Sequence, residues 1–252
     1  MEKFIELKNM QASIFALASR SNTKVLHSHK IGQLSVPKNG IIYFAVQGQL
    51  YISPPNIAVY IPANTPHCIY KTSPQTIIEN IYFSKEYFNL LPQVTKTIVL
   101  SDLSKILIAR LCKTSSNKLN TSKIQQMLNL LLEELHENTN KAEYKFKMPQ
   151  NELLIKIFNY ILTNDIENLP SLYDCAQIIS VSSRTLQRII KQELNISFVL
   201  WRGQILFMRA LELLHKYKKT SIVTYQLGYN SESAFISMFK KFSGGKVPSY
   251  FY

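Results

Sequence analysis

The chain is poor in residues that could cross-link it or carry it into a membrane. Its three cysteines, Cys68, Cys112 and Cys175, are odd in number and widely spaced, and none belongs to a C-x-x-C pair. We therefore expect neither a disulfide framework nor a zinc knuckle, and we expect these cysteines to be buried. No apolar run approaches the ~18 residues of a membrane span, and the start "MEKFIELKNM" lacks the apolar core and cleavage site of a signal peptide. The sequence predicts a cytoplasmic protein with no membrane partner.

Acidic residues are scarce as well. The 252 residues include 16 aspartates and glutamates against 29 lysines and arginines, a net charge of +13. We find no paired carboxylates for acid/base work, no Ser/His/Asp arrangement and no phosphate-binding loop in the sequence, so it predicts that the protein is not an enzyme. The excess of basic over acidic residues is densest in residues 171–252, with 11 basic and 4 acidic residues. This positive charge suits a partner with a phosphate backbone, although Lys-rich surfaces also serve solubility alone.

The apolar periodicity divides the chain into three segments. Up to about residue 95, short runs rich in Val, Ile, Tyr and Phe alternate with turn signals, which is typical of an antiparallel β-sandwich or barrel with a tight hairpin at Gly48. From residue 96 the period is helical, and the polar stretch 136–151 indicates a linker. The sequence predicts an α+β protein with segments 1–95, 96–148 and 149–252, the last of them all helical.

The middle segment holds one strongly apolar helix. "TSKIQQMLNLLLEELHEN" begins with a Thr or Ser cap and repeats Ile124, Leu128, Leu131 and Leu135 at helical spacing, and further leucines widen the stripe. A helix of this kind is buried against its own domain or against a second subunit, so a homodimer is one of two interpretations.

The last segment contains the same arrangement twice. In "SLYDCAQIISVSSRTLQRIIKQE" an S-x-x-D capping box at Ser171 opens a short helix, a break follows, and Ser182 caps a second helix. One face of that second helix is basic and carries Arg184, Gln187, Arg188 and Lys191. Arginine can bind guanine and glutamine can bind adenine in a major groove, as a recognition helix requires; the alternative is a solvated charged face.

A second copy of the arrangement favours the interpretation of the basic face as that of a recognition helix. "TSIVTYQLGYNSESAFISMFKKF" again gives a short helix, a turn at 228–230 and a second helix, and the long helix "FVLWRGQILFMRALELLHKYKK" connects the two copies. Two helix-turn-helix units on a stiff connection would meet successive major grooves of double-stranded DNA, about 34 Å apart.

The residues of this segment resemble the DNA-binding domain of the AraC/XylS family of bacterial transcription regulators. The resemblance rests on "SSRTLQR" (182–188), "FMRALELL" (207–214) and "LGYNSESAFISMFKKF" (227–242), followed by Gly244 and Pro248. The resemblance implies that the protein is an activator or repressor that binds DNA. It also implies RNA polymerase as a second partner. The implied DNA-contacting residues are Ser182, Arg184, Gln187, Arg188, Lys191, Asn230, Ser231, Glu232, Ser233, Ser237 and Lys240.

Three departures from the family pattern fall in the second unit. Ser237 stands where relatives often carry arginine, Thr224 stands where a packed alanine is usual, and "SGGKVP" is one residue longer than the usual spacing from Gly to Pro. We therefore expect the first unit to supply the stronger contacts to bases.

The N-terminal segment carries a histidine motif. "HSHKIGQLSVPKNG" is similar to the first cupin motif, HxHx(3–4)Ex(6)G, with Gln33 in the place of the glutamate, and "IPANTPH" is similar to the second, PxGxxH, with Asn64 in the place of the glycine. The resemblance implies a cupin-like sensor domain whose metal ligands would be His27, His29, Gln33 and His67. Cys68 follows His67 in an extended strand, so its side chain should face away from them.

Three interpretations of these histidines stay open. Three imidazoles and a neutral amide suit Zn, Ni, Cu or Fe, so the site can be a metal sensor. The same residues can be a signature of the fold that binds no ion, or they can border a barrel that takes a small organic effector. The leading hypothesis is a DNA-binding regulator with a metal or small-molecule effector; the rival is a metal-dependent cupin enzyme with an accessory DNA-binding domain, which Gln33 disfavours because catalytic cupins usually keep a carboxylate there.

Overall fold

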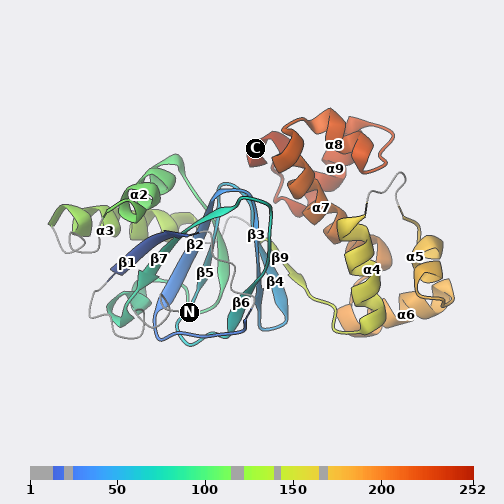
Figure 1. The fold of residues 1–252 in the computed structure, drawn as a ribbon, viewed down its shortest axis with the longest axis horizontal. Helices are drawn as coiled ribbons and strands as arrows, with labels where there is room; N and C mark the ends of the chain where they lie inside the picture. The colour runs from blue at the N-terminus through green and yellow to red at the C-terminus, as the bar shows by residue number, and fades with distance from the viewer. Residues whose placement is uncertain (1–13, 20–24, 115–121, 139–142, 165–169) are drawn as a thin grey trace. The chain divides into compact units, whose positions relative to one another are not determined.

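The structure, a computed structural model, describes residues 14–19, 25–114, 122–138, 143–164 and 170–252, and of residues 14–19 the backbone only. It divides into two compact units, Met1–Lys145 and Phe146–Tyr252. Figure 1 shows that strands dominate the first unit and helices the second. Among the described helices, none combines the length and the hydropathy that crossing a membrane requires.

Two sheets form the N-terminal unit, and every strand pair with a defined register is antiparallel. The first sheet has the order β1 (Ile14–Ser19), β7 (Ile77–Phe83), β2 (Gly32–Asn39), β5 (Ile57–Ile61) and β8 (Lys96–Val99). The second has the order β6 (His67–Thr72), β3 (Ile42–Val46), β4 (Gln49–Ser53) and β9 (Lys145–Lys147), and β9 contains the boundary between the units. Apolar residues of both sheets share one buried cluster, which includes Ile42, Phe44, Val59 and Ile61. The predicted β-sandwich and the α+β fold class are confirmed.

The hairpin predicted at Gly48 joins β3 to β4. Its two central residues, Gln47 and Gly48, have φ values of 49° and 75°. Positive φ at both positions is the type I′ geometry, whose twist matches that of the flanking strands. The turn therefore fixes the register in which Val46 lies opposite Gln49.

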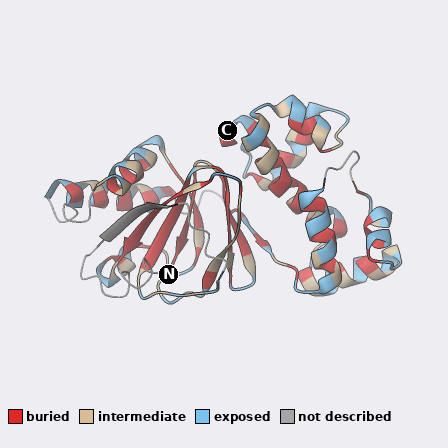
Figure 2. Cartoon of the chain, viewed as in Figure 1, coloured by how far each residue is buried: buried red, intermediate tan, exposed pale blue. Residues whose placement is uncertain are grey.

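Two helices cover the outer face of the first sheet. These are α2 (Asp102–Cys112) and α3 (Ser122–Asn138), and the short helix η1 (Lys85–Leu90) precedes β8. The leucine stripe of α3 is buried in the same cluster as Leu34 and Ile81 of the sheet, and Figure 2 shows the buried sides of both helices. Packing within its own unit thus accounts for the apolar stripe of α3.

The segment predicted as 96–148 differs from the structure in two ways. Residues Lys96–Val99 and Lys145–Lys147 are strands, β8 and β9, because sheet pairing outweighs the local helical periodicity. The helices α2 and α3 belong to the core of the first unit, and the division into units falls after Lys145. The cysteine expectation holds for Cys175, which is buried, whereas Cys68 and Cys112 are half-buried.

The C-terminal unit is helical beyond β9. Its helices are α4 (Glu152–Thr163), α5 (Leu172–Ile178), α6 (Ser183–Leu194), α7 (Phe198–Tyr217), α8 (Thr220–Gln226), α9 (Glu232–Phe242) and η3 (Pro248–Phe251). The long helix α7 packs against α4, α6, α8, α9 and η3. Its buried face includes Trp201, Ile205, Met208 and Leu211, as the spacing predicted. A helix of 20 residues is about 30 Å long, so α7 is long enough to hold two helix pairs well apart.

Helices α5 and α6 form the first helix-turn-helix unit. The predicted capping box is present: Ser171 Oγ accepts from Asp174 N at 3.1 Å, and Ser171 N donates to an Asp174 carboxylate oxygen at 2.8 Å. Ser180 has a left-handed φ of 54° in the turn. Ser182 then caps α6 by accepting from Thr185 N at 3.1 Å, as predicted.

Helices α8 and α9 repeat this arrangement. The turn contains Gly228 with a φ of 70°, and Tyr229 N donates to Thr224 O at 3.1 Å. In the first unit Val181 N makes the equivalent bond to Ala176 O, also at 3.1 Å. The two units therefore share a turn geometry although their sequences differ.

Candidate metal centre and nucleic-acid interface

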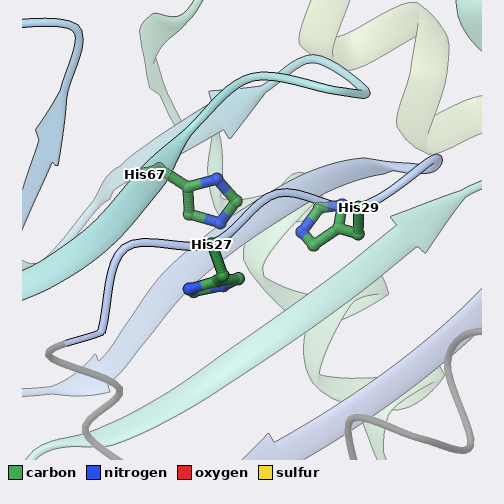
Figure 3. A group of neighbouring side chains, drawn as sticks. All are labelled: His27, His29 and His67. Carbon is green, nitrogen blue, oxygen red and sulfur yellow. The ribbon is translucent and has the colours of Figure 1, made fainter.

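The backbone brings the three histidines together. His27 and His67 form an isolated antiparallel bridge, in which His27 N donates to His67 O at 3.0 Å and His67 N donates to His27 O at 2.8 Å. Next to it, Asn64 N donates to His29 O at 2.7 Å. Asn64 has a φ of 60°, so it adopts the left-handed conformation expected of the glycine whose place it takes, and asparagine tolerates that conformation. Figure 3 shows the resulting group of three rings.

Each of the three rings is oriented by a backbone carbonyl two residues away. Their Nδ1 atoms lie 2.9, 2.7 and 2.8 Å from the oxygens of Val25, Ile31 and Thr65, for His27, His29 and His67 respectively. A carbonyl oxygen can only accept, so Nδ1 must carry the hydrogen in every ring. In the neutral form each ring therefore offers the lone pair of Nε2, and hydrogen bonds of this type commonly orient metal-binding histidines.

Gln33 stands beside two of these rings. Its Oε1 atom lies 2.8 Å from His29 Nε2 and 3.2 Å from His67 Nε2. Its amide nitrogen donates to Ser35 Oγ at 2.8 Å and to Asn80 Oδ1 at 3.2 Å, and Ser35 donates to Asn80 at 2.6 Å. This network keeps the buried amide of Gln33 in place at the edge of the histidine group.

The arrangement places acceptors opposite acceptors. A neutral Nε2 and an amide oxygen repel one another unless a cation lies between them or the amide is turned so that its NH2 group faces the rings. Neighbouring ligands of one ion with bonds of about 2.1 Å lie about 3.0–3.4 Å apart in octahedral or tetrahedral geometry. The separations from Gln33 are close to that range, and the candidate ligand atoms of the three histidines all lie within 4.8 Å of one another. The residues therefore fit a transition metal.

Burial keeps two of the rings neutral. It lowers the pKa of His67 to about 4, and it also lowers the pKa of His29. The ring of His29 packs edge-on against Tyr82, with the centroids 5.7 Å apart. A histidine must be neutral to bind a metal, so both are in the binding form at neutral pH. Cys68, on the next position of β6, is not part of this group, as the strand alternation predicted.

The predicted basic face of α6 is open to solvent. Arg184, Gln187, Arg188 and Lys191 are all exposed, whereas Leu186 and Ile190 on the other side are fully buried. Arg188 Nη1 donates to Gln192 Oε1 at 3.2 Å, which leaves the rest of the guanidinium for a partner. The structure thus presents one amide and three cations on one helix face, and their contacts with DNA stay a prediction.

The residues predicted in the second unit are exposed as well. They are Asn230, Ser231, Glu232, Ser233, Ser237 and Lys240. Ser231 Oγ accepts from Ala234 N at 3.2 Å and so caps α9, in the same way that Ser182 caps α6. Both serines therefore have a structural role, which the sequence predicted for Ser182 but not for Ser231.

The departures in the second unit leave its fold intact. The hydroxyl of the buried Thr224 donates to Thr220 O at 3.0 Å, so the extra polar atom relative to alanine has a partner. After α9, Ser243 Oγ donates to Lys246 O at 2.5 Å and Gly245 N donates to Lys240 O at 3.0 Å, which closes the longer loop. The absence of an arginine at position 237 remains the one departure that changes the exposed surface.

Sequence reasoning missed two residues of the N-terminal site, Ser35 and Asn80, which hold the amide of Gln33. Ser35 lies two positions after Gln33 on β2, so strand alternation alone could have placed it on the same face. Asn80 comes from β7, and its position opposite Ser35 depends on the sheet register, which the sequence does not reveal.

Residues 175–250 match a protein family described as a helix-turn-helix domain. The HTH-type transcriptional regulator NimR of Escherichia coli (strain K12) is 27% identical over 220 residues, which cover 87% of this chain and 79% of that protein. Among solved structures, the C-terminal domain of AraT from Geobacillus stearothermophilus is 28% identical and matches 40% of this chain and 84% of its own, with a TM-score of 0.35. Fatty-acid-bound ToxT from Vibrio cholerae is 12% identical, with 95% of both chains covered and a TM-score of 0.39.

Two helix pairs, each with a serine-capped second helix that exposes one polar face, together with the sequence match over 175–250, define a transcription regulator that binds DNA. Residues 175–250 thus contain the helix-turn-helix domain that the motifs in 182–242 indicated.

Proposed function

We propose that the N-terminal unit of this regulator binds a divalent transition metal through His27, His29 and His67, with Gln33 as a fourth, neutral ligand. The observation that supports the proposal is the common orientation of the three rings, each of which directs Nδ1–H to a backbone carbonyl and leaves Nε2 for an ion. Imidazole and amide donors suit Zn, Ni, Cu or Fe. A bound ion would also separate the facing acceptor atoms of Gln33 and the rings.

We further propose that the metal is sensed and not used for catalysis. The four ligands carry no net charge, so the site lacks the anionic carboxylate on which metal-dependent oxygenases commonly rely. The metal then acts as an effector: it changes the DNA affinity of the C-terminal unit only to the extent that it prefers one of two conformations of the chain.

A titration of the full chain tests the metal site. Ni²⁺, Zn²⁺, Cu²⁺ and Co²⁺ are added separately to the wild-type protein, to the variant His27→Ala/His67→Ala, and to His136→Ala as a control for an exposed imidazole on α3. Loss of two ligands should lower the affinity for the preferred metal by at least ~100-fold. The reason is that substitution of residues that only orient ligands already lowers metal affinity by about 10–100-fold. Equal binding to the wild type and the double variant would show that no metal uses this group.

The same proteins test the link to DNA. The operator is obtained by sequencing the genomic fragments that the protein selects, and DNA affinity is then measured by fluorescence anisotropy with the metal and with a chelator. We expect the wild-type affinity to change on metal removal and that of His27→Ala/His67→Ala to stay constant. A metal that binds without changing DNA affinity would contradict sensing while leaving the metal site in place.

For the DNA interface we propose that Arg184, Gln187 and Arg188 of α6 contact base edges. Their exposure on one face of a capped helix supports this. Each substitution to alanine should weaken binding to the selected operator by about 1–3 kcal/mol while unrelated DNA is affected less. An equal loss for every DNA sequence would instead indicate contacts with phosphates alone.

A location and two partners complete the proposal. We place the protein in the cytoplasm, where bacterial DNA lies, and propose RNA polymerase as a partner of the DNA-bound form. We also propose a homodimer, since Leu103 and Ile106 of α2 and Leu130 of α3 remain 40%, 65% and 40% exposed. Sedimentation of the full chain tests this last point, and a monomer at all concentrations would refute it.

A further inference from the structure

A second cavity lies in the N-terminal unit, on the outer face of the first sheet and away from the histidines. It has a volume of about 230 Å³ and lies where α2 meets the ends of β2, β5 and β7. Its walls are partly apolar, with Val36, Pro55, Ile108 and Ala109, and partly charged, with Glu79, Lys38, Lys105 and Lys113. Drug-sized ligands usually occupy about 300–1,000 Å³, so this cavity suits a smaller metabolite.

The carboxylate of Glu79 is the unusual feature of this cavity. Glu79 is 6% exposed, and none of the described residues donates a hydrogen bond to its side chain or forms an ion pair with it. Burial raises the pKa of this carboxyl, against the opposing effect of Lys38 and Lys113. A carboxyl group that lines a cavity and has no donor among the described residues can accept an N–H or O–H group from a ligand.

The lysines of the cavity indicate which second polar group a ligand would carry. Lys105 is held by Asp102, at 2.6 Å, and by Asn56, at 3.0 Å. Lys38 and Lys113 are exposed and make no ion pair with any described residue, although both are close enough to act on the charge of Glu79. Two such ammonium groups suit a carboxylate on the ligand.

We propose that this cavity binds a small α-amino or α-hydroxy acid with an aliphatic side chain. The ammonium or hydroxyl group of the ligand donates to Glu79, its carboxylate lies between Lys38 and Lys113, and its side chain packs against Val36 and Ile108. A ligand held in this way contacts both the sheet and α2, and it therefore stabilises the packing of α2. The proposal does not depend on the metal site, since the two sites share no residue.

Four related probes separate the two halves of this recognition. Thermal unfolding and calorimetry of the full chain are carried out with valine, 2-hydroxyisovalerate, isovalerate and isobutylamine at millimolar concentrations. Valine or 2-hydroxyisovalerate should raise the melting temperature by several degrees. Isovalerate lacks the donor and isobutylamine lacks the carboxylate, so each should bind at least ~10-fold more weakly than the better acid.

Variants locate the binding. Glu79→Gln preserves the size of the side chain and removes the buried charge, and Lys113→Met removes one exposed ammonium group, so both variants should fold. Both should lose the stabilisation by the acid, whereas Lys123→Met, an exposed lysine of α3 outside the cavity, should keep it. The proposal is overturned if none of the four probes shifts the melting temperature, or if the shift is the same in Glu79→Gln and Lys113→Met as in the wild type.

Discussion

At the scale of single residues, Gly40, the last residue of the histidine motif "HSHKIGQLSVPKNG", has no room for a side chain. It has a φ of +79°, and a Cβ atom at this position would lie 2.2 Å from Thr76 Oγ1 and 2.5 Å from Ser73 Oγ. We expect Gly40→Ala to destabilise the N-terminal unit by about 2–4 kcal/mol, because backbone strain and overlap add. Gly245→Ala is the matched control, since its φ of +83° carries the same strain but nothing lies within 4 Å of the added atom. Calorimetric unfolding should show the larger effect for Gly40→Ala, and equal effects would contradict the steric argument.

Glu79 should make the stability of the free protein depend on pH. Burial raises its pKa in the folded state, so the folded form holds its proton more tightly than the unfolded form. Its contribution to stability is then fully present below the unfolded pKa, about 4.3, and is lost as the pH rises through the raised folded value. Lys38 and Lys113 oppose this loss. Lys105 also lines the cavity, where Asp102 and Asn56 hold its ammonium group.

We therefore expect Glu79→Gln to melt at a higher temperature than the wild type at pH 7 in the absence of ligand. The difference should shrink as the pH falls below the wild-type pKa of this group. Thermal unfolding across this pH range measures the effect. A difference that stays constant across the range would mean that the substitution acts through packing and not through the charge.

At the scale of helices, α6 and α9 should contribute unequally to DNA recognition. The exposed face of α6 offers guanidinium and amide groups, whereas that of α9 offers hydroxyls, the carboxylate of Glu232 and the ammonium group of Lys240 but no guanidinium. We expect Arg184→Ala/Gln187→Ala to weaken operator binding by about 2–4 kcal/mol. The matched variant Ser233→Ala/Ser237→Ala should weaken operator binding by less than about 1 kcal/mol. Anisotropy with the selected operator measures both, and a larger loss from the α9 variant would reverse the assignment.

The helices of the C-terminal unit were predictable because their signals are local. Capping serines such as Ser171 and Ser182, and apolar spacing such as that of Trp201 and Ile205, act within a few residues of the chain. The hairpin at Gly48 was predictable for the same reason. The strands β8 and β9 were not, because short strands gain their stability from pairing with distant segments.

The same distinction separates the parts of the two N-terminal sites. The spacing of His27, His29 and Gln33 is visible in the sequence, and so is a second motif that ends at His67. The cavity at Glu79 left no such pattern, since its lysines come from β2 and from both ends of α2 and meet only through the sheet register. Contacts of this kind can be predicted only when the fold is known.

At the scale of the whole molecule, a metal that changes DNA affinity must itself be bound differently by the DNA complex. If the metal alters operator affinity by some factor, the operator alters metal affinity by the same factor, because the four states form a closed thermodynamic cycle. We expect a factor between about 5 and 150. Metal affinity is measured by calorimetry with and without the operator, and operator affinity by anisotropy with and without the metal. His136→Ala should preserve the factor, whereas His27→Ala/His67→Ala should reduce it to one. Two unequal factors in the wild type would mean that a second metal site contributes, and a factor of one in both measurements would show that the N-terminal unit does not report metal to the DNA-binding unit.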